Sequence, residues 1–225
     1  MLREVKEQYG HQPITEGKTI WPDFGSIQFP SPPLPFTRLP DEVLERLWGY
    51  IDKATLNVND RLAGNITQSL ELVDEEGWFF KTILSPVCVH YLEDCPLVQS
   101  SRPPSQVPKG IRLESLWVNF SKQHEFNPPH NHSGVISFVI WMNIPTRSSD
   151  QHNNPISKNS DYPAASDFQF LYSNILGNIS TYSIPMDPEL NGTLILFPAT
   201  LSHTVFPFYN CQEDRVSISG NINYV

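Results

Sequence analysis

The second half of the chain alternates short apolar runs with polar clusters that favour turns. Five runs rich in β-branched and aromatic residues stand out, at 111–120, 135–144, 168–172, 193–197 and 216–219. Each run is bounded by Pro, Gly, Asn or Ser, which is typical of short strands joined by turns. Because no helical pattern separates these strands, they predict a sandwich or a barrel.

The first half of the chain shows a helical pattern. Residues 40–42, Pro-Asp-Glu, predict a helix start, because proline suits the first turn and acids favour the positive end of the helix dipole. Apolar residues then recur every three or four positions and predict one apolar face, formed by Val43, Leu44, Leu47, Trp48 and Ile51. A second helical stretch is expected from about 75 to 92, with a kink or restart at Pro86.

Helices followed by strands predict an α+β layout, in which the helices support a β core. Residues 1–39, with proline at positions 13, 22, 30, 32, 33 and 35, predict an extended arm lying on the domain. Residues 40–225 are expected to form a single domain, with helical support over 40–105 and the β core over 106–225. The polar segment 146–167 separates two predicted strands, and we expect this long loop to be a lid over the mouth of a site.

Charge and composition narrow the class of protein. The chain carries a formal net charge of −9 and no cluster of Lys or Arg, which argues against a nucleic-acid partner. Its apolar runs are too short for a membrane span, and the charged N-terminus lacks the apolar stretch of a signal peptide. Three cysteines, Cys88, Cys95 and Cys211, lack C-x-x-C spacing and predict reduced thiols in a cytoplasmic protein.

The first candidate chemistry is an H-x-H pair, His130 and His132, directly before a predicted strand. In an extended segment residues i and i+2 point the same way, so both imidazoles can reach one ion. His203 follows the 193–197 strand, and the fold can bring it next to the pair. Imidazole binds Fe, Zn, Cu and Ni alike, so the residue types alone do not select the metal. The remaining histidines are expected to be structural or exposed, namely His11, His90, His124 and His152.

The second candidate is an anion site twelve residues after His203. Arg215 and Ser217 point to the same face of a predicted strand, where a guanidinium can take a carboxylate through two hydrogen bonds and a hydroxyl can add a third. A buried arginine needs an anionic partner. The alternative is that Arg215 pairs with Glu213 or Asp214, or lies at the surface.

Together these residues resemble the 2-oxoglutarate/Fe(II)-dependent oxygenases, within them the prolyl-4-hydroxylase-like group that includes phage and marine bacterial proteins. The likeness spans roughly residues 36–225 and rests on the segments 117–119, 130–135, 192–198, 202–203 and 215–219. The resemblance implies a mainly β (α+β) fold, a cupin-like double-stranded β-helix or jelly roll with N-terminal supporting helices. It also implies Fe(II) as cofactor and 2-oxoglutarate and O2 as co-substrates.

The resemblance further implies the roles of the site residues. His130, His132 and His203 would bind Fe(II), and Arg215 and Ser217 would hold the 5-carboxylate of 2-oxoglutarate. Asn119, a polar residue in an apolar strand, is expected to contact the co-substrate's carboxylate or carbonyl, with Asn143 a weaker candidate. The wider superfamily has an acid where this chain has His132, so the predicted site consists of three imidazoles.

The implied reaction is hydroxylation of an aliphatic C–H, of a prolyl or other peptidyl residue or of a small molecule, in the host cytoplasm if the protein is phage-encoded. Three alternatives stay open. A cupin would usually place a Glu a few residues after the H-x-H pair, and 133–143 contains no acid. A non-catalytic metal- or sugar-binding jelly roll would not bind 2-oxoglutarate at Arg215. A phage accessory protein would use the histidines only to take up zinc.

Overall fold

The computed structural model describes residues 32–101 and 108–225, with the side chains of 99–101 left aside. Most of the predicted arm, residues 1–31, therefore lies outside the described residues, as do residues 102–107. The elements in chain order are β1 (Phe36–Arg38), α2 (Asp41–Lys53), η1 (Asn59–Arg61), β2 (Gln68–Glu71), η2 (Glu75–Gly77), η3 (Phe80–Leu84), α3 (Ser85–Asp94), α4 (Pro96–Ser101), β3 (Ile111–Ser121), β4 (Asn127–His130), β5 (Ile136–Asn143), α5 (Ser148–His152), β6 (Phe168–Ser173), β7 (Ile179–Ile184), η4 (Pro188–Leu190), β8 (Thr193–Pro198), β9 (Ser202–Val205) and β10 (Arg215–Tyr224).

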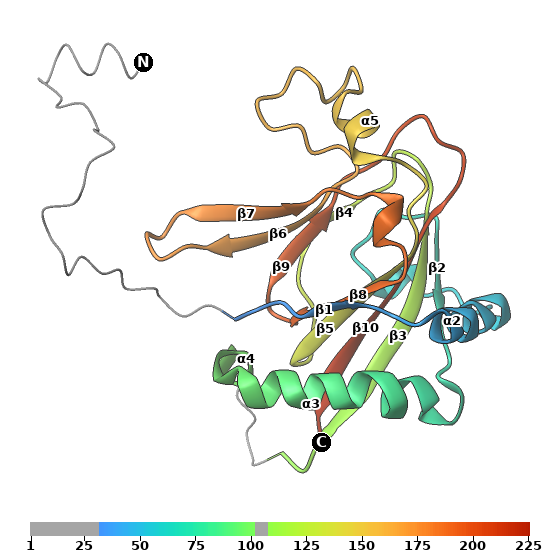
Figure 1. The fold of residues 1–225 in the computed structure, drawn as a ribbon, viewed down its shortest axis with the longest axis vertical. Helices are drawn as coiled ribbons and strands as arrows, with labels where there is room; N and C mark the ends of the chain where they lie inside the picture. The colour runs from blue at the N-terminus through green and yellow to red at the C-terminus, as the bar shows by residue number, and fades with distance from the viewer. Residues whose placement is uncertain (1–31, 102–107) are drawn as a thin grey trace, which may run out of the picture. The chain divides into compact units, whose positions relative to one another are not determined.

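The strands of the described residues form two antiparallel sheets. The larger sheet has the order β1-β8-β5-β10-β3-β2, and the smaller has the order β4-β9-β6-β7. From β3 onward the chain passes back and forth between the two sheets, which is the topology of a double-stranded β-helix (Figure 1). The predicted jelly roll is thus confirmed.

The helices support the outer face of the larger sheet, as predicted. One core cluster joins fully buried side chains of the helices and of the sheet. The helices contribute Leu47 of α2, Leu84 directly before α3 and Cys88 within α3. The sheet contributes Val118 and Ile218. Each fully buried Leu or Val contributes about 1.5–3 kcal/mol to folding. This core covers one face of the larger sheet, and the other face of that sheet packs toward the smaller sheet.

Strand β5 shows how the second core arises. Side chains alternate between the faces of a strand, so Phe138 and Ile140 join the helices while Val139 and Trp141 face the smaller sheet. There they pack with aromatic residues that include Phe168. The candidate site lies on this inner side, between the two sheets.

All five predicted strands are present, and β10 extends further than expected. The patterns did not reveal β1, β2, β4, β7 and β9, which are short or lack strong alternation. Helix α2 begins after Pro40, as predicted. Its buried face differs from the prediction, because Trp48 is 36% exposed and Tyr50 is buried instead. Pro86 lies in the first turn of α3 and so restarts the helix there, as predicted.

Three further expectations can be compared with the structure. All three cysteines are free thiols, two of them buried. Among the described residues no helix is both long enough and apolar enough to cross a membrane. The segment 146–167 was expected to be a loop, yet it contains α5 and several buried side chains, so it is more structured than predicted.

Candidate functional site

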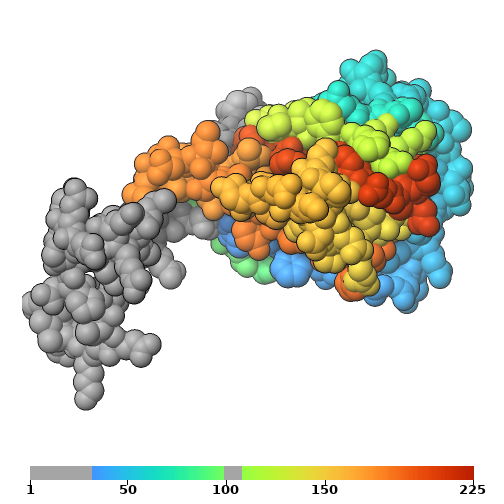
Figure 2. All heavy atoms as spheres, turned by 90° about the horizontal axis from the view of Figure 1, so that it is seen from above, coloured from blue at the N-terminus to red at the C-terminus, as the bar shows by residue number. Residues whose placement is uncertain are grey.

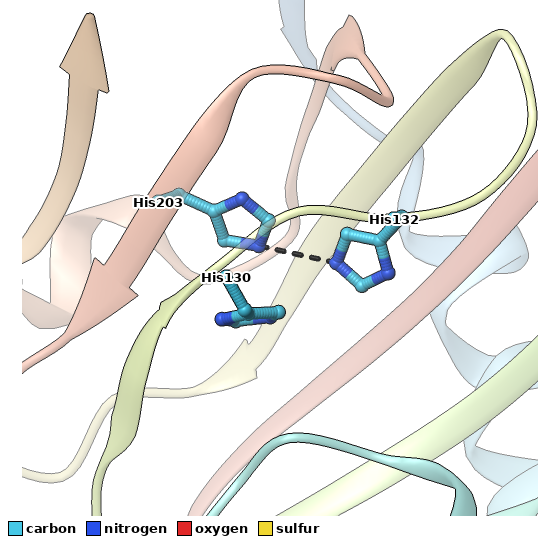
Figure 3. A group of neighbouring side chains, drawn as sticks. All are labelled: His130, His132 and His203. Carbon is cyan, nitrogen blue, oxygen red and sulfur yellow. Dashed lines mark hydrogen bonds between the residues drawn. The ribbon is translucent and has the colours of Figure 1, made fainter.

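Three histidines meet at the open end of the jelly roll (Figure 3). His130 is the last residue of β4 and lies directly opposite His203 of β9 in the antiparallel pairing. His132 follows in the loop after β4, held by a backbone hydrogen bond from its N–H to the carbonyl of Ala199. One ring nitrogen from each of the three histidines lies within 4.8 Å of the others, and the group contains no carboxylate.

Backbone carbonyls set the orientation of two of the three rings. His130 Nδ1 lies 2.7 Å from the carbonyl of Pro128, and His203 Nδ1 lies 3.1 Å from the carbonyl of Leu201. Since a carbonyl only accepts, Nδ1 carries the proton in each ring and Nε2 keeps its lone pair. This is the usual arrangement of a metal-binding histidine, whose second nitrogen donates to a neighbouring acceptor.

His132 completes the group. Its Nε2 lies 3.2 Å from Nε2 of His203, within hydrogen-bond distance (Figure 3). Two nitrogens bound to one ion at about 2.0–2.1 Å lie roughly 3 Å apart, so this spacing already fits shared coordination. The donor set therefore suits a transition-metal ion, and three imidazoles are compatible with Fe, Zn, Cu or Ni.

The cluster is buried enough to favour neutral imidazoles. Burial lowers the pKa of His203 to about 3 and that of His132 to about 4, with repulsion from neighbouring histidines adding to the effect. Burial also lowers the pKa of His130. Neutral imidazole is the form that binds a metal, so the site is ready for an ion at neutral pH.

Aromatic rings pack around the cluster. Trp117 lies against His132 with ring centroids 5.7 Å apart, and Phe168 stacks on His203 at 5.5 Å. Four aromatic residues are buried and also line the cavity described next, namely Trp117, Phe138, Trp141 and Phe197. These walls hold the histidines in place and keep water from much of their surface.

A cavity of about 470 Å³ opens beside the histidines and is lined from both sheets. Its size lies within the roughly 300–1,000 Å³ of small-molecule pockets. All six residues proposed from the sequence line it, namely Asn119, His130, His132, His203, Arg215 and Ser217. The structure therefore brings the predicted cation site and the predicted anion site into one cavity.

Arg215 is the charged group of the inner part of this cavity. It is 4% exposed and donates to the carbonyls of Ser166, at 3.0 Å, and Phe206, at 3.1 Å. Burial lowers its pKa to about 10, so it stays charged at neutral pH. No carboxylate of the described residues lies within ion-pair distance of it, so the alternative of a pair with Glu213 or Asp214 is wrong. A buried cation without an anion is costly, and the cavity can receive one.

Ser217 and Asn119 lie side by side across the β10–β3 pair. Asn119 is buried, and its Oδ1 accepts a hydrogen bond of 2.8 Å from Ser69 Oγ. This bond leaves the amide nitrogen of Asn119 without a partner among the described residues, so it can donate to a ligand in the cavity. Asn143, the weaker candidate, instead donates to the carbonyl of Asp214 at 2.9 Å and does not line the cavity.

The segment 146–167 contributes in a way that the sequence did not reveal. It reaches Arg215 through the backbone carbonyl of Ser166, while none of its residues lines the cavity. Its helix α5 is tied down by Gln151, whose side chain bonds both the N–H and the carbonyl of Tyr209, and by the pair His152–Asp167 at 2.7 Å. Contacts made by backbone groups leave no side-chain pattern, so no sequence signal could have found them. A lid role for this segment stays a prediction.

Among the remaining histidines, His152 is structural because of this pair. His90 is exposed and bonds Asp94, and His124 is exposed with its ring edge against Tyr209. His11 lies outside the described residues. The prediction that these histidines are structural or exposed is thus confirmed for the three that are described.

A jelly roll with a histidine cluster and a buried arginine in one cavity is compatible with a non-haem metal oxygenase that uses a 2-oxo acid. Residues 115–221 match the model of a family described as "Putative 2OG-Fe(II) oxygenase". All six predicted site residues fall inside this match. These residues are thus similar to the 2OG-Fe(II) oxygenases, in agreement with the resemblance seen in the sequence. The family's cofactor is Fe(II), its co-substrates are 2-oxoglutarate and O2, and its members are oxidoreductases.

Solved structures of similar form cover most of the chain. They include an oxidoreductase of the 2OG-Fe(II) oxygenase family from Burkholderia pseudomallei (10% identity, 84% of each chain, TM-score 0.49) and a prolyl-4-hydroxylase from Pseudomonas putida (10% identity, 84% of this chain and 91% of that one, TM-score 0.46). A third is a prolyl hydroxylase from Trichoplax adhaerens in complex with a peptide fragment of the hypoxia inducible factor oxygen degradation domain (16% identity, 86% and 84%, TM-score 0.45). No curated protein matches the chain. All three TM-scores are too low to bear on this chain's substrate.

Proposed function

We propose that this protein is an Fe(II)- and 2-oxoglutarate-dependent dioxygenase that hydroxylates an aliphatic C–H bond. The observation that carries the proposal is the pairing, in one cavity, of three histidine nitrogens with a buried arginine that lacks an acidic partner. A dicarboxylate that chelates a metal at one end needs this combination of a cation site and an anion site.

In this proposal His130, His132 and His203 hold the metal through Nε2, while Arg215 and Ser217 hold the 5-carboxylate of 2-oxoglutarate. Asn119 donates from its free amide nitrogen to the co-substrate. Fe(II) held there would supply the chemistry by which 2-oxoglutarate and O2 become succinate and CO2, with the second oxygen atom of O2 inserted into the substrate C–H.

The protein's own groups prepare the site in two ways. Because the protein ligands are three neutral imidazoles, the metal keeps its full positive charge, which favours binding of a doubly negative co-substrate. The surrounding aromatic rings keep water away, which strengthens the bond between Arg215 and a carboxylate. Among the described residues that line the cavity, the only carboxylates are Glu71 and Glu114, each near an arginine, Arg61 and Arg112 respectively.

For the substrate, we propose a side chain of a peptide, proline included. The cavity is bordered by η1 and the loop that follows it. Arg61 and Ala63 are exposed there, so the cavity opens to the surface at this point. Asn131 and Ser133 line the cavity from the opposite loop and are also exposed, so they can hydrogen-bond a peptide backbone. These features support the entry of a side chain from a larger molecule.

The test is turnover of 2-oxoglutarate. Purified protein loaded with Fe(II) is supplied with 2-oxoglutarate, O2 and a library of proline-containing and proline-free peptides, and succinate and peptide mass are measured. We expect succinate formation and a gain of one oxygen atom in the peptide, both lost in His203→Ala. Metal binding without any 2-oxoglutarate turnover would instead favour a non-catalytic metal-binding jelly roll. Turnover of 2-oxoglutarate with no modified peptide would overturn only the peptide substrate.

A further inference from the structure

The two sheets have four outer edges, and three of these carry features that discourage pairing with another chain. Strand β1 is three residues long and carries Arg38, β2 is four residues long and carries Glu71, and β4 contains Pro128 and Pro129. Short length, charge and proline are the usual means by which proteins protect a sheet edge. The fourth edge, formed by β7, has none of these features.

Strand β7 is six residues long, Ile179–Ile184, and contains neither a charged residue nor a proline. The absence of charge extends over the whole hairpin, because residues 168–186 contain no Asp, Glu, Lys or Arg. Two other stretches, 126–146 and 191–212, also lack charged residues, but the only outer edge strand they contain is β4, which its prolines protect. Strand β6 occupies one edge of β7, and no described strand occupies the other.

The hairpin β6–β7 also exposes large apolar side chains. Its turn and the start of β7 carry Ile175, Leu176 and Ile179, which are 67%, 80% and 82% exposed, and Tyr182 further along is 61% exposed. Figure 1 shows the hairpin extending beyond the strands it pairs with, and in Figure 2 its orange atoms project from the described domain. Exposed apolar surface of this kind marks an interaction site.

We propose that the outer edge of β7 pairs antiparallel with β7 of a second copy of this chain, joining two small sheets across a twofold axis. A twofold interface needs a surface that is complementary to itself, and an uncharged strand edge meets this need, since its N–H and C=O groups pair with the same groups turned around. Each copy carries a formal charge of −9, and a hairpin without charged residues lets two copies meet there at low electrostatic cost.

A substrate peptide is the less suitable occupant of this edge. In the smaller sheet β7 lies at the side opposite to β4, which carries His130. A peptide on the outer edge of β7 would lie three strand spacings from β9, which carries His203, and four from β4. At about 4.7–4.9 Å per spacing, these separations are roughly 14 Å and 19 Å. A peptide paired along β7 would therefore not present its side chain to the histidines. The dimer is independent of the proposed catalysis.

Sedimentation velocity of the full chain over the micromolar range tests the proposal. We expect a monomer–dimer equilibrium, with a dimer dissociation constant at least about tenfold higher in Ile179→Lys and Tyr182→Lys, since a charge on an edge strand opposes pairing. The matched control is Val73→Lys, which changes a residue 72% exposed on the loop after β2 and should leave the equilibrium unchanged.

Amide hydrogen exchange locates the interface in the same samples. The amides of 179–184 should exchange more slowly as the concentration of the wild-type chain rises, and not in Ile179→Lys. Thermal unfolding of each variant checks that it is folded. A monomer at all concentrations, or a dimer that both hairpin variants leave intact, would overturn the proposal.

Discussion

The guanidinium of Arg215 donates a 3.0 Å hydrogen bond to the carbonyl of Ser166, and Ser166 presents that carbonyl from a left-handed backbone conformation with φ of +74°. Ser166 is fully buried, and its hydroxyl has no hydrogen-bond partner among the described residues. This backbone conformation is strained for residues other than glycine. A buried hydroxyl without a hydrogen-bond partner lowers the free energy of unfolding further. Ser166 therefore destabilises the fold at the position where its carbonyl supports the proposed anion site.

This relationship predicts that Ser166→Gly stabilises the protein. Glycine adopts the positive φ without strain and removes the unpartnered hydroxyl, while the carbonyl that bonds Arg215 stays in place. We expect the free energy of unfolding to rise by about 1 kcal/mol, with 2-oxoglutarate affinity unchanged. Urea unfolding measures it, with Ser173→Gly, on the exposed face of the regular strand β6, as the control that should lose stability. A loss of stability in Ser166→Gly would mean that the hydroxyl has a role.

Replacing Arg215 by an apolar side chain of similar length should separate ligand binding from folding. In Arg215→Met we expect metal binding to persist and 2-oxoglutarate affinity to fall by about 100-fold or more, because a buried charge partner is lost. The ligand-free protein should be as stable as wild type, since an unpaired buried charge has been removed. Thermal unfolding with and without 2-oxoglutarate checks both points, because a bound ligand raises Tm. An unchanged shift of Tm by 2-oxoglutarate would remove Arg215 from the anion site.

The buried histidines make the metal-free protein sensitive to acid. The pKa values of His132 and His203 are lowered to about 4 and about 3, against 6.5 in the unfolded chain. Below pH 6.5 the unfolded chain therefore binds more protons than the folded one, and stability present above pH 6.5 is lost as the pH falls toward 4. Between pH 7 and pH 5 the chelator-treated protein should lose roughly 2–4 kcal/mol.

Urea unfolding at a series of pH values measures this loss. The double variant His132→Asn/His203→Asn should show a flatter dependence on pH, since asparagine does not titrate. An equally steep dependence in that variant would assign the acid sensitivity to other groups.

Gly134 lies in the loop that carries His132 and contacts Ile222 of β10. Its φ is +94°, and a Cβ at this position would lie 2.7 Å from the carbonyl oxygen of Ile222. Gly134→Ala should therefore displace the loop that carries His132, with a loss of roughly 2–4 kcal/mol in stability and weaker metal binding. Calorimetric metal titration and urea unfolding measure the two effects.

The matched control is Gly177→Ala in the β6–β7 turn. Gly177 also has a positive φ, of +78°, but a Cβ there would meet nothing within 4 Å. Gly177→Ala should lower the free energy of unfolding by only about 1 kcal/mol and leave metal binding unchanged. Equal effects of the two substitutions on metal affinity would show that the contact with Ile222 does not position His132.

The six residues proposed from the sequence line one cavity, whereas several of the strands that place them were not predicted. His130, His203 and Arg215 could be found because their chemistry requires particular side chains at particular spacings, and period-two alternation placed Ser217 on the same face as Arg215. Strand β4 was missed because two of its four residues are prolines, which are rare in strands, and β7 because its apolar and polar residues do not alternate regularly.

Other features depend on contacts between distant segments. The orientation of Asn119 by Ser69, and the support of Arg215 by the carbonyls of Ser166 and Phe206, arise only once the strands are paired. The burial of Tyr50 and the exposure of Trp48 likewise depend on which face of α2 packs against the core, which the apolar spacing did not specify. Local patterns could not have supplied any of these.

The most direct test of the proposed site is an anaerobic titration of the Fe(II)-loaded protein with 2-oxoglutarate, followed by visible absorption. Chelation of Fe(II) by the 2-oxo acid produces a weak metal-to-ligand charge-transfer band, which we expect in the wild type and not in His203→Ala. Saturation should require far more 2-oxoglutarate in Arg215→Met. If the wild-type protein binds Fe(II) and shows no band at saturating 2-oxoglutarate, the three histidines do not form the proposed oxygenase site.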